Sequence, residues 1–109
     1  MNWKALLIDP KDNVVIALDR LHPGDDALYR DFSGNTAYVK VLDEIPVYHK
    51  IALKDFNDGD TILKYGECIG TAYGPIKTGA HVHVQNVRDI RGTLMMRDEN
   101  GLLKREETE

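Results

Sequence analysis

The sequence has one cysteine, Cys68, and one serine, Ser33, in 109 residues. A single cysteine excludes an internal disulfide, and its place in an apolar run predicts a buried, inert thiol. The lone serine stands in a polar loop with no base near it in the sequence, so nothing indicates a serine nucleophile with its triad. A glycine-rich phosphate loop and a cysteine-rich zinc pattern are also missing. These absences remove several common classes of enzyme.

Long hydrophobic runs are missing as well. No apolar segment approaches the roughly 20 residues that a membrane-spanning helix needs. The first ten residues, MNWKALLIDP, lack the apolar centre of a secretion signal. We therefore expect a cytoplasmic protein that does not associate with membranes.

An excess of positive charge is absent too. The chain has 14 basic and 18 acidic residues and a formal net charge of −4, which argues against binding to duplex nucleic acid. With 42% hydrophobic and 29% charged residues, the composition is that of an ordinary globular protein. Single domains usually hold about 100–150 residues, so we expect one domain with a modest core. Such a core is too small to enclose a large active site by itself.

What the sequence does have is a series of short apolar runs bounded by turn residues. The runs are rich in Val, Ile and Thr and are too short for helices, so they predict strands. They cover residues 3–8, 13–18, 37–42, 49–53, 61–63, 68–72 and 81–84. Only short helical turns are expected, near residues 26–30 and 54–56, and no internal repeat is evident. The prediction is a mostly β fold.

The C-terminal part differs in character from the rest. The predicted domain covers residues 1–88, and residues 89–109 form an arm that could add a hairpin or lie on a partner. The last six residues, KREETE, are almost all charged and are expected to be disordered.

The sharpest local signal is the pattern HVHVQ at residues 81–85. Alternation on a strand would place His81, His83 and Gln85 on one face and the two valines in the core. The Cα atoms of the two histidines would lie about 6.6 Å apart, close enough for both imidazoles to bind one metal ion. A third ligand would have to arrive by tertiary folding, and His49 is the local candidate. The alternative is an exposed polar face above a valine core.

Two lysines lie beside polar aromatic residues near turns. Lys50 follows His49, and Lys64 precedes Tyr65. Two ammonium groups at neighbouring strand ends would suit a carboxylate or phosphate. The alternative is two solvated lysines whose stems cover apolar surface. The fourth histidine, His22, stands in a turn and is expected to be exposed and to bind no ligand.

The segments DNV, HKIALKDFNDGDTILKYGECIG and IKTGAHVHVQN together resemble the N-terminal domain of the altronate and galactarate dehydratase family. This domain belongs to the SAF group, whose fold is the β-clip. The resemblance covers roughly residues 12–88, and it is specific because order and spacing hold together. The matching positions are His49, Lys50, Asp55, Gly59, Lys64, Tyr65, Gly66, Ile69, Gly70, Gly79, His81, His83 and Asn86.

Three features depart from the family pattern. Tyr48 stands where glycine often precedes the His-Lys pair, and Gln85 stands where a third histidine is common. The large catalytic region of the full-length dehydratases is absent. Some relatives, such as sulfolactate sulfo-lyase, look split into a small chain of this type and a separate large chain. The resemblance therefore implies a small subunit of a two-chain lyase.

The chemistry that the resemblance implies is metal-assisted β-elimination from a sugar acid or hydroxy acid. A base removes the proton α to a carboxylate, a divalent metal (Fe, Mn or Mg) stabilises the enolate, and water or sulfite leaves. On this interpretation His49, Lys50, Lys64 and Tyr65 would contact the substrate, with His49 a candidate catalytic residue. His81 and His83 are the candidate metal ligands.

Two other interpretations stay open. One is a stand-alone binding module for a small acid or a protein partner, without catalysis. The other is a self-contained metal enzyme that uses the strand of His81 and His83. The chain could also form a homo-oligomer, and for the two-chain lyase the substrate is a small sugar acid or hydroxy acid.

Overall fold

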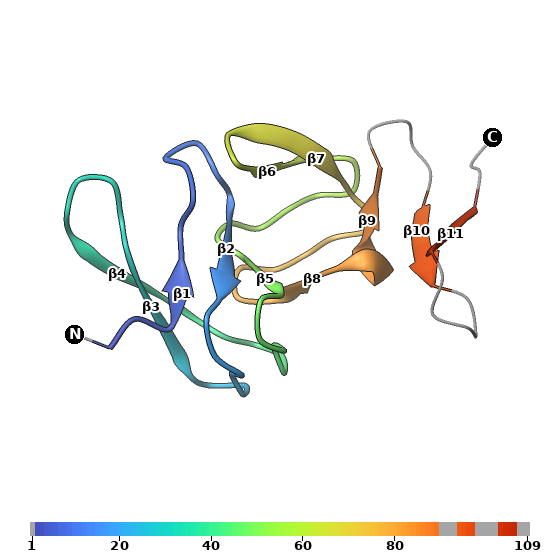
Figure 1. The fold of residues 1–109 in the computed structure, drawn as a ribbon. Coiled ribbons are helices and arrows are strands. Elements are labelled where there is room, and N and C mark those ends of the chain that lie inside the picture. Colours follow the sequence, from blue (N-terminus) through green and yellow to red (C-terminus); the bar gives the residue numbers. More distant parts are fainter. Residues whose placement is uncertain (1, 90–93, 98–102, 107–109) are drawn as a thin grey trace.

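The computed structural model describes residues 2–89 and the backbone of 94–97 and 103–106. These residues form antiparallel sheets and one short 3-10 helix, η1 (Val84–Asn86) (Figure 1). The first sheet has the strand order β1 (Ala5–Leu6), β2 (Val14–Ala17), β5 (Lys50–Ala52) and β8 (His81–Val82). The second has the order β11 (Leu103–Glu106), β10 (Leu94–Arg97), β9 (Val87–Arg88), β7 (Glu67–Ala72) and β6 (Thr61–Lys64). Strands β3 (Asp26–Arg30) and β4 (Thr36–Lys40) pair with each other.

The prediction of a mostly β fold is confirmed by this arrangement. Within the described ranges, no helix is long and apolar enough to cross a membrane. The backbone of the arm forms a hairpin, because β10 pairs with β11 and also with β9. Of the six residues predicted to be disordered, 104–106 lie in β11, and 107–109 fall outside the described residues.

Strand β2 divides the apolar core into two clusters. All four of its residues are buried, as the continuous apolar run predicts. Val15 and Ala17 pack on one side with Ile45 and Ile51. Val14 packs on the other side; its cluster also holds Ala52, Phe56, Ile62, Ala72, Ile76, Val82 and Val87. Because β5 lies directly beside β2, the histidine that precedes β5 is held at a fixed place above this core.

Within residues 2–89, a five-residue turn with shared backbone features occurs four times, at residues 21–25, 45–49, 56–60 and 76–80. We call it the bridge turn. Its first residue is apolar and buried, its fourth has a positive φ, and its fifth donates its N–H to the carbonyl of the second. The first residues pair as antiparallel bridges, Leu21 with Ile45 and Phe56 with Ile76. The structure therefore has a repeated unit where the sequence shows none, because only two positions in five are constrained.

The backbone conformation at the fourth position of the bridge turn shows why the family pattern often has glycine where this chain has Tyr48. Three of the four turns carry glycine there, Gly24, Gly59 and Gly79, with φ of 93°, 86° and 89°. The remaining turn carries Tyr48 with φ of 70°, a left-handed conformation that costs a side chain free energy. Glycine is thus the residue that this backbone favours, and Tyr48 occupies the position under strain.

Three local predictions were wrong. Residues 26–30 form strand β3 instead of a helical turn, because every one of them pairs with β4. The segment 54–56 forms a bend that leads into the third bridge turn at Phe56. Cys68 is exposed, because it stands at the beginning of β7, next to the Tyr65–Gly66 turn and outside both core clusters.

Candidate functional site

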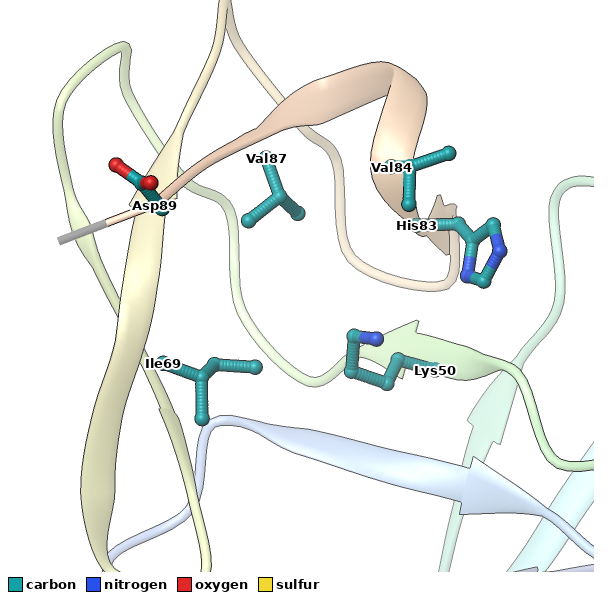
Figure 2. Close-up of a pocket in the computed structure, with 6 residues that line it drawn as sticks. All are labelled: Lys50, Ile69, His83, Val84, Val87 and Asp89. Atoms are coloured by element: carbon teal, nitrogen blue, oxygen red, sulfur yellow. The ribbon is translucent and has the colours of Figure 1, made fainter. Parts of the chain in front are cut away.

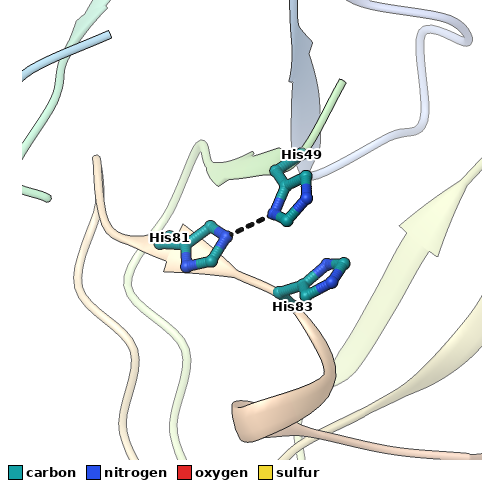
Figure 3. Close-up of side chains that lie close together, drawn as sticks. All are labelled: His49, His81 and His83. Atoms are coloured by element: carbon teal, nitrogen blue, oxygen red, sulfur yellow. Dashed lines mark hydrogen bonds between the residues drawn. The ribbon is translucent and has the colours of Figure 1, made fainter. Parts of the chain in front are cut away.

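Three histidines from two distant parts of the chain meet on one face of the first sheet (Figure 3). One ring nitrogen of each of His49, His81 and His83 lies within 4.8 Å of the others. The rings are stacked, with centroids 5.1 Å apart for His49 and His81, 3.9 Å for His49 and His83, and 5.5 Å for His81 and His83. All three side chains are partly buried. The predicted convergence of His49 on the other two is confirmed.

The pairing of β5 with β8 brings the cluster together. His49 is the last residue of the second bridge turn and directly precedes β5, while His81 belongs to β8 and lies opposite Ile51. The backbone N–H of His81 donates to Asp43 Oδ2 at 2.9 Å, which fixes the start of β8. Val82 points into the core with no exposed surface, so its neighbours His81 and His83 must both point to the opposite face.

The strand ends earlier than the sequence predicts. Strand β8 stops at Val82, and Asn86 closes the following turn with three hydrogen bonds. Its side-chain oxygen accepts the His83 N–H at 3.0 Å, its backbone N–H donates to the His83 carbonyl at 3.0 Å, and its side-chain amide donates to the His81 carbonyl at 2.9 Å. Val84 therefore lies in η1 and is half-buried, so its predicted place in the core was wrong.

A chain of hydrogen bonds links Gln85, His81 and His49. Gln85 Nε2 lies 3.2 Å from His81 Nδ1, and His81 Nε2 lies 2.8 Å from His49 Nδ1. When the Gln85 amide N–H donates, His81 carries its proton on Nε2 and donates to His49. Turning the amide so that its oxygen accepts reverses both bonds and leaves His49 Nε2 without a proton. The glutamine that replaces a common family histidine thus sets the tautomer of the pair.

Burial keeps these imidazoles neutral. It lowers the pKa of His49, and the adjacent Lys50 ammonium lowers that pKa further. Burial is also the main cause of the lowered pKa of His81, followed by His49, while the Asp43 carboxylate acts in the opposite direction. Near pH 7 both rings are therefore uncharged, the state in which a histidine nitrogen can accept a proton or bind a metal.

Lys50 and His83 share a pocket of about 170 Å³ beside the histidine cluster (Figure 2). Its other lining residues are Ile69, Val84, Val87 and Asp89. Burial lowers the pKa of Lys50, and the charge of Lys64 lowers it further. The pocket thus combines the Lys50 ammonium, the His83 ring and the Asp89 carboxylate with three apolar side chains.

Lys64 and Tyr65 stand at the hairpin between β6 and β7. The Lys64 ammonium lies 4.8 Å from the centroid of the Tyr65 ring, which is 60% exposed. The buried Asp12 carboxylate holds the turn, accepting the N–H groups of Tyr65 at 3.1 Å and Gly66 at 2.8 Å. Lys64 is close enough to affect the pKa of Lys50, but no contact between Tyr65 and the three histidines is seen in the described part of the chain.

The structure thus assembles most, but not all, of the predicted set. His49, His81, His83 and Lys50 come together, with Lys64 nearby and Tyr65 at a distance. Sequence reasoning placed Gln85 on the same face as His81 but missed its hydrogen bond to that ring. It also missed the pocket residues Val87 and Asp89, for which the sequence holds no signal, since they come from the far end of the domain.

Comparison with known proteins agrees with this architecture. The model of the altronate/galactarate dehydratase SAF domain matches residues 3–90. A (2R)-sulfolactate sulfo-lyase subunit alpha from Chromohalobacter salexigens is 41% identical over 56 residues, which span 51% of this chain and 60% of that protein. The altronate dehydratase of Bacillus subtilis is 37% identical over 81 residues, 74% of this chain but only 15% of that protein. Because the family model spans most of the chain, this protein belongs to the altronate/galactarate dehydratase SAF domain family.

Proposed function

We propose that this chain is the small subunit of a two-chain lyase that acts on a sugar acid or hydroxy acid. The observation that carries the proposal is the convergence of three histidines beside the pocket of Lys50, on a domain too small to enclose a substrate. Two kinds of relative support it: one carries the name of a lyase subunit alpha, and in the other the matching region is a small part of a longer dehydratase.

The residues of this chain suit the first step of a β-elimination. The Lys50 ammonium attracts the substrate carboxylate, and Lys64 adds to the positive potential at the same place. His49 is neutral, and in the chain without an ion bound at the histidines its Nε2 can accept the proton α to that carboxylate when its Nδ1–H donates to His81. His49 has this tautomer when the Gln85 side-chain oxygen, in place of its nitrogen, faces His81 Nδ1 and accepts the proton there. A divalent metal in the assembled enzyme would stabilise the negative charge of the enolate.

The large chain would supply what this domain lacks. The pocket beside Lys50 is open to one side, and a partner that covers it would exclude water and strengthen the charge interactions inside. We therefore expect the isolated chain to show no turnover of altronate, galactarate or sulfolactate, and the complex to show turnover of one of them.

The test is purification of the tagged chain from its native cell, followed by lyase assays on what is purified with it. A large lyase chain in equal amounts, with activity that the small chain alone lacks, supports the proposal. His49→Gln and Lys50→Gln should each lower the activity of the complex at least tenfold, while Lys40→Gln should not. Lys40 is a suitable control because it is exposed on β4 and paired with Asp26. Turnover by the small chain alone would show a self-contained enzyme, and a stable chain with no large partner would favour a binding module.

A further inference from the structure

We propose that His49, His81 and His83 form a binding site for one divalent transition-metal ion on this chain itself, with Gln85 as the residue that orients His81. The structure shows these side chains as a hydrogen-bonded, stacked cluster. The inference does not depend on a large catalytic chain. It concerns a property that the isolated domain should have.

The positions of the nitrogens allow such a site. A metal ion bound to imidazole lies about 2.0–2.1 Å from each nitrogen, so tetrahedral ligand nitrogens are about 3.4 Å apart. The present separation of His49 Nδ1 and His81 Nε2 is 2.8 Å, and no pair of candidate nitrogens exceeds 4.8 Å. One pair must open by about half an ångström, and the widest must close by about 1.4 Å.

Side-chain rotation alone can make this change. The three ring planes lie within 15–20° of parallel, and each ring must tilt so that its nitrogen lone pair points at a common centre. The backbone beneath is already fixed, by the β5–β8 pairing on one side and by the hydrogen bonds of Asn86 on the other. No strand has to move.

The second partner of His81 is in place as well. Metal-bound histidines usually donate their other ring N–H to an oxygen, which fixes the ring orientation. His81 Nδ1 lies 3.2 Å from the Gln85 side-chain amide, and an amide turned to present its oxygen would accept that proton. His81 Nε2 would then be left for the ion.

The ligand set also selects the ion. Three neutral imidazoles suit Fe²⁺, Co²⁺, Ni²⁺, Cu²⁺ and Zn²⁺, whereas Mg²⁺ prefers carboxylate, carbonyl and water oxygens. In the described residues, no carboxylate belongs to the cluster. Among the metals that the family resemblance implies, this favours iron over magnesium. Three protein ligands also leave at least one coordination position for water or for an oxygen of a ligand.

The test is calorimetric titration of the metal-free full chain with Zn²⁺, Co²⁺ and Mg²⁺ in separate experiments. We expect one Zn²⁺ or Co²⁺ per chain and no measurable binding of Mg²⁺. His49→Gln, His81→Gln and His83→Gln should each weaken the binding of Zn²⁺ more than tenfold, and Gln85→Ala should weaken it about tenfold. His22→Gln is the matched control, because His22 lies in an exposed loop and pairs with Glu44.

A second measurement needs no variant and so does not depend on whether the variants fold. Nuclear magnetic resonance of the wild-type chain should show Co²⁺ broadening the ring signals of three histidines and leaving those of His22. Absence of saturable binding, equal broadening of all four histidines, or full affinity in the folded His83→Gln variant would each overturn the proposal. The proposed lyase subunit would survive such a result, because its test depends on the large chain and on activity.

Discussion

His81 Nε2 lies 2.8 Å from His49 Nδ1, although 32 positions separate the two residues in the chain. The contact exists because β5 and β8 are neighbours in the first sheet while β6 and β7 leave for the second. It joins a histidine that ends a turn to one that begins a strand. The pair is the centre of the candidate site, and most of the following predictions test the structure around it.

The first prediction concerns the titration of the histidines in the metal-free protein. The pKa values of His49 and His81 should lie below 6.5, because burial disfavours their charged forms. The pKa of His22 should lie above 6.5, because its ring Nδ1–H donates to the Glu44 carboxylate, whose negative charge also favours the protonated ring. Ring-proton chemical shifts measured against pH report each value. A cluster histidine that titrates above His22 would contradict the burial seen here.

These shifts also set the direction of a pH effect on folding. The unfolded chain binds protons at the two cluster histidines near pH 6.5, while the folded chain does so only at lower pH. The contribution of these two histidines to the free energy of unfolding is therefore fully present above pH 6.5. It is lost as the pH falls through their lowered pKa values in the folded protein. Urea unfolding between pH 8 and 5 should show the loss, and the variant with both His49→Gln and His81→Gln should show less of it.

The second prediction concerns the strained position of Tyr48. Tyr48→Gly should be more stable than Tyr48→Ala by about 1 kcal/mol, because only glycine adopts positive φ without cost. Both variants lose the same exposed ring, which is 71% accessible, so the difference isolates the backbone. Urea unfolding measures it. If alanine proves as stable as glycine, this turn lacks the left-handed geometry of its three counterparts.

In the fourth bridge turn the equivalent residue is already glycine, Gly79, so the test there replaces glycine with alanine. Its φ is 89°, and a Cβ there would collide with the carbonyl oxygen of Lys40. Gly79→Ala should therefore cost more than about 2 kcal/mol, because the positive φ and the collision both oppose the added methyl group. Thermal unfolding followed by circular dichroism would show it, and Gly59→Ala, where space is open, should cost less.

The third prediction concerns Asp12, which lies far from Tyr65 and Gly66 in sequence but accepts both of their backbone N–H groups. Asp12→Ala should destabilise the protein by about 2–4 kcal/mol, because bonds to a charged acceptor are strong and their donors are left unsatisfied. Asp19→Ala is the control, because its ion pair with Lys4 is exposed and screened by solvent and should contribute much less to stability. Equal losses in the two variants would mean that Asp12 does not hold the turn.

The fourth prediction separates scaffold from functional surface around β8. Val82→Ala should cost about 2–3 kcal/mol, because Val82 is fully buried and leaves a cavity. Val84→Ala should cost about half as much, since Val84 is only half-buried in η1. Replacing both His81 and His83 with Gln should change stability least and affinity for metal most. A double variant that unfolds as readily as Val82→Ala would make the histidine face structural.

The sequence alone determined the elements that depend on local pattern. Continuous apolar residues predict that β2 is buried on both faces, and alternation predicts that Tyr38 and Lys40 point away from Val39, which is 5% exposed. Alternation also places His81 and His83 on one face. These predictions succeeded because they depend on the two-residue period of a strand, which neighbours along the chain set by themselves.

The tertiary structure alone decided where these elements meet and where they end. The pairing of β5 with β8 chose His49 as the third member of the cluster, and the hydrogen bonds of Asn86 ended β8 before Val84. The bridge turns repeat without a repeat in sequence, since four different sets of residues satisfy the same demand for one buried side chain and one positive φ. Contacts between residues tens of positions apart depend on the packing of the whole chain, so no local pattern could have specified them.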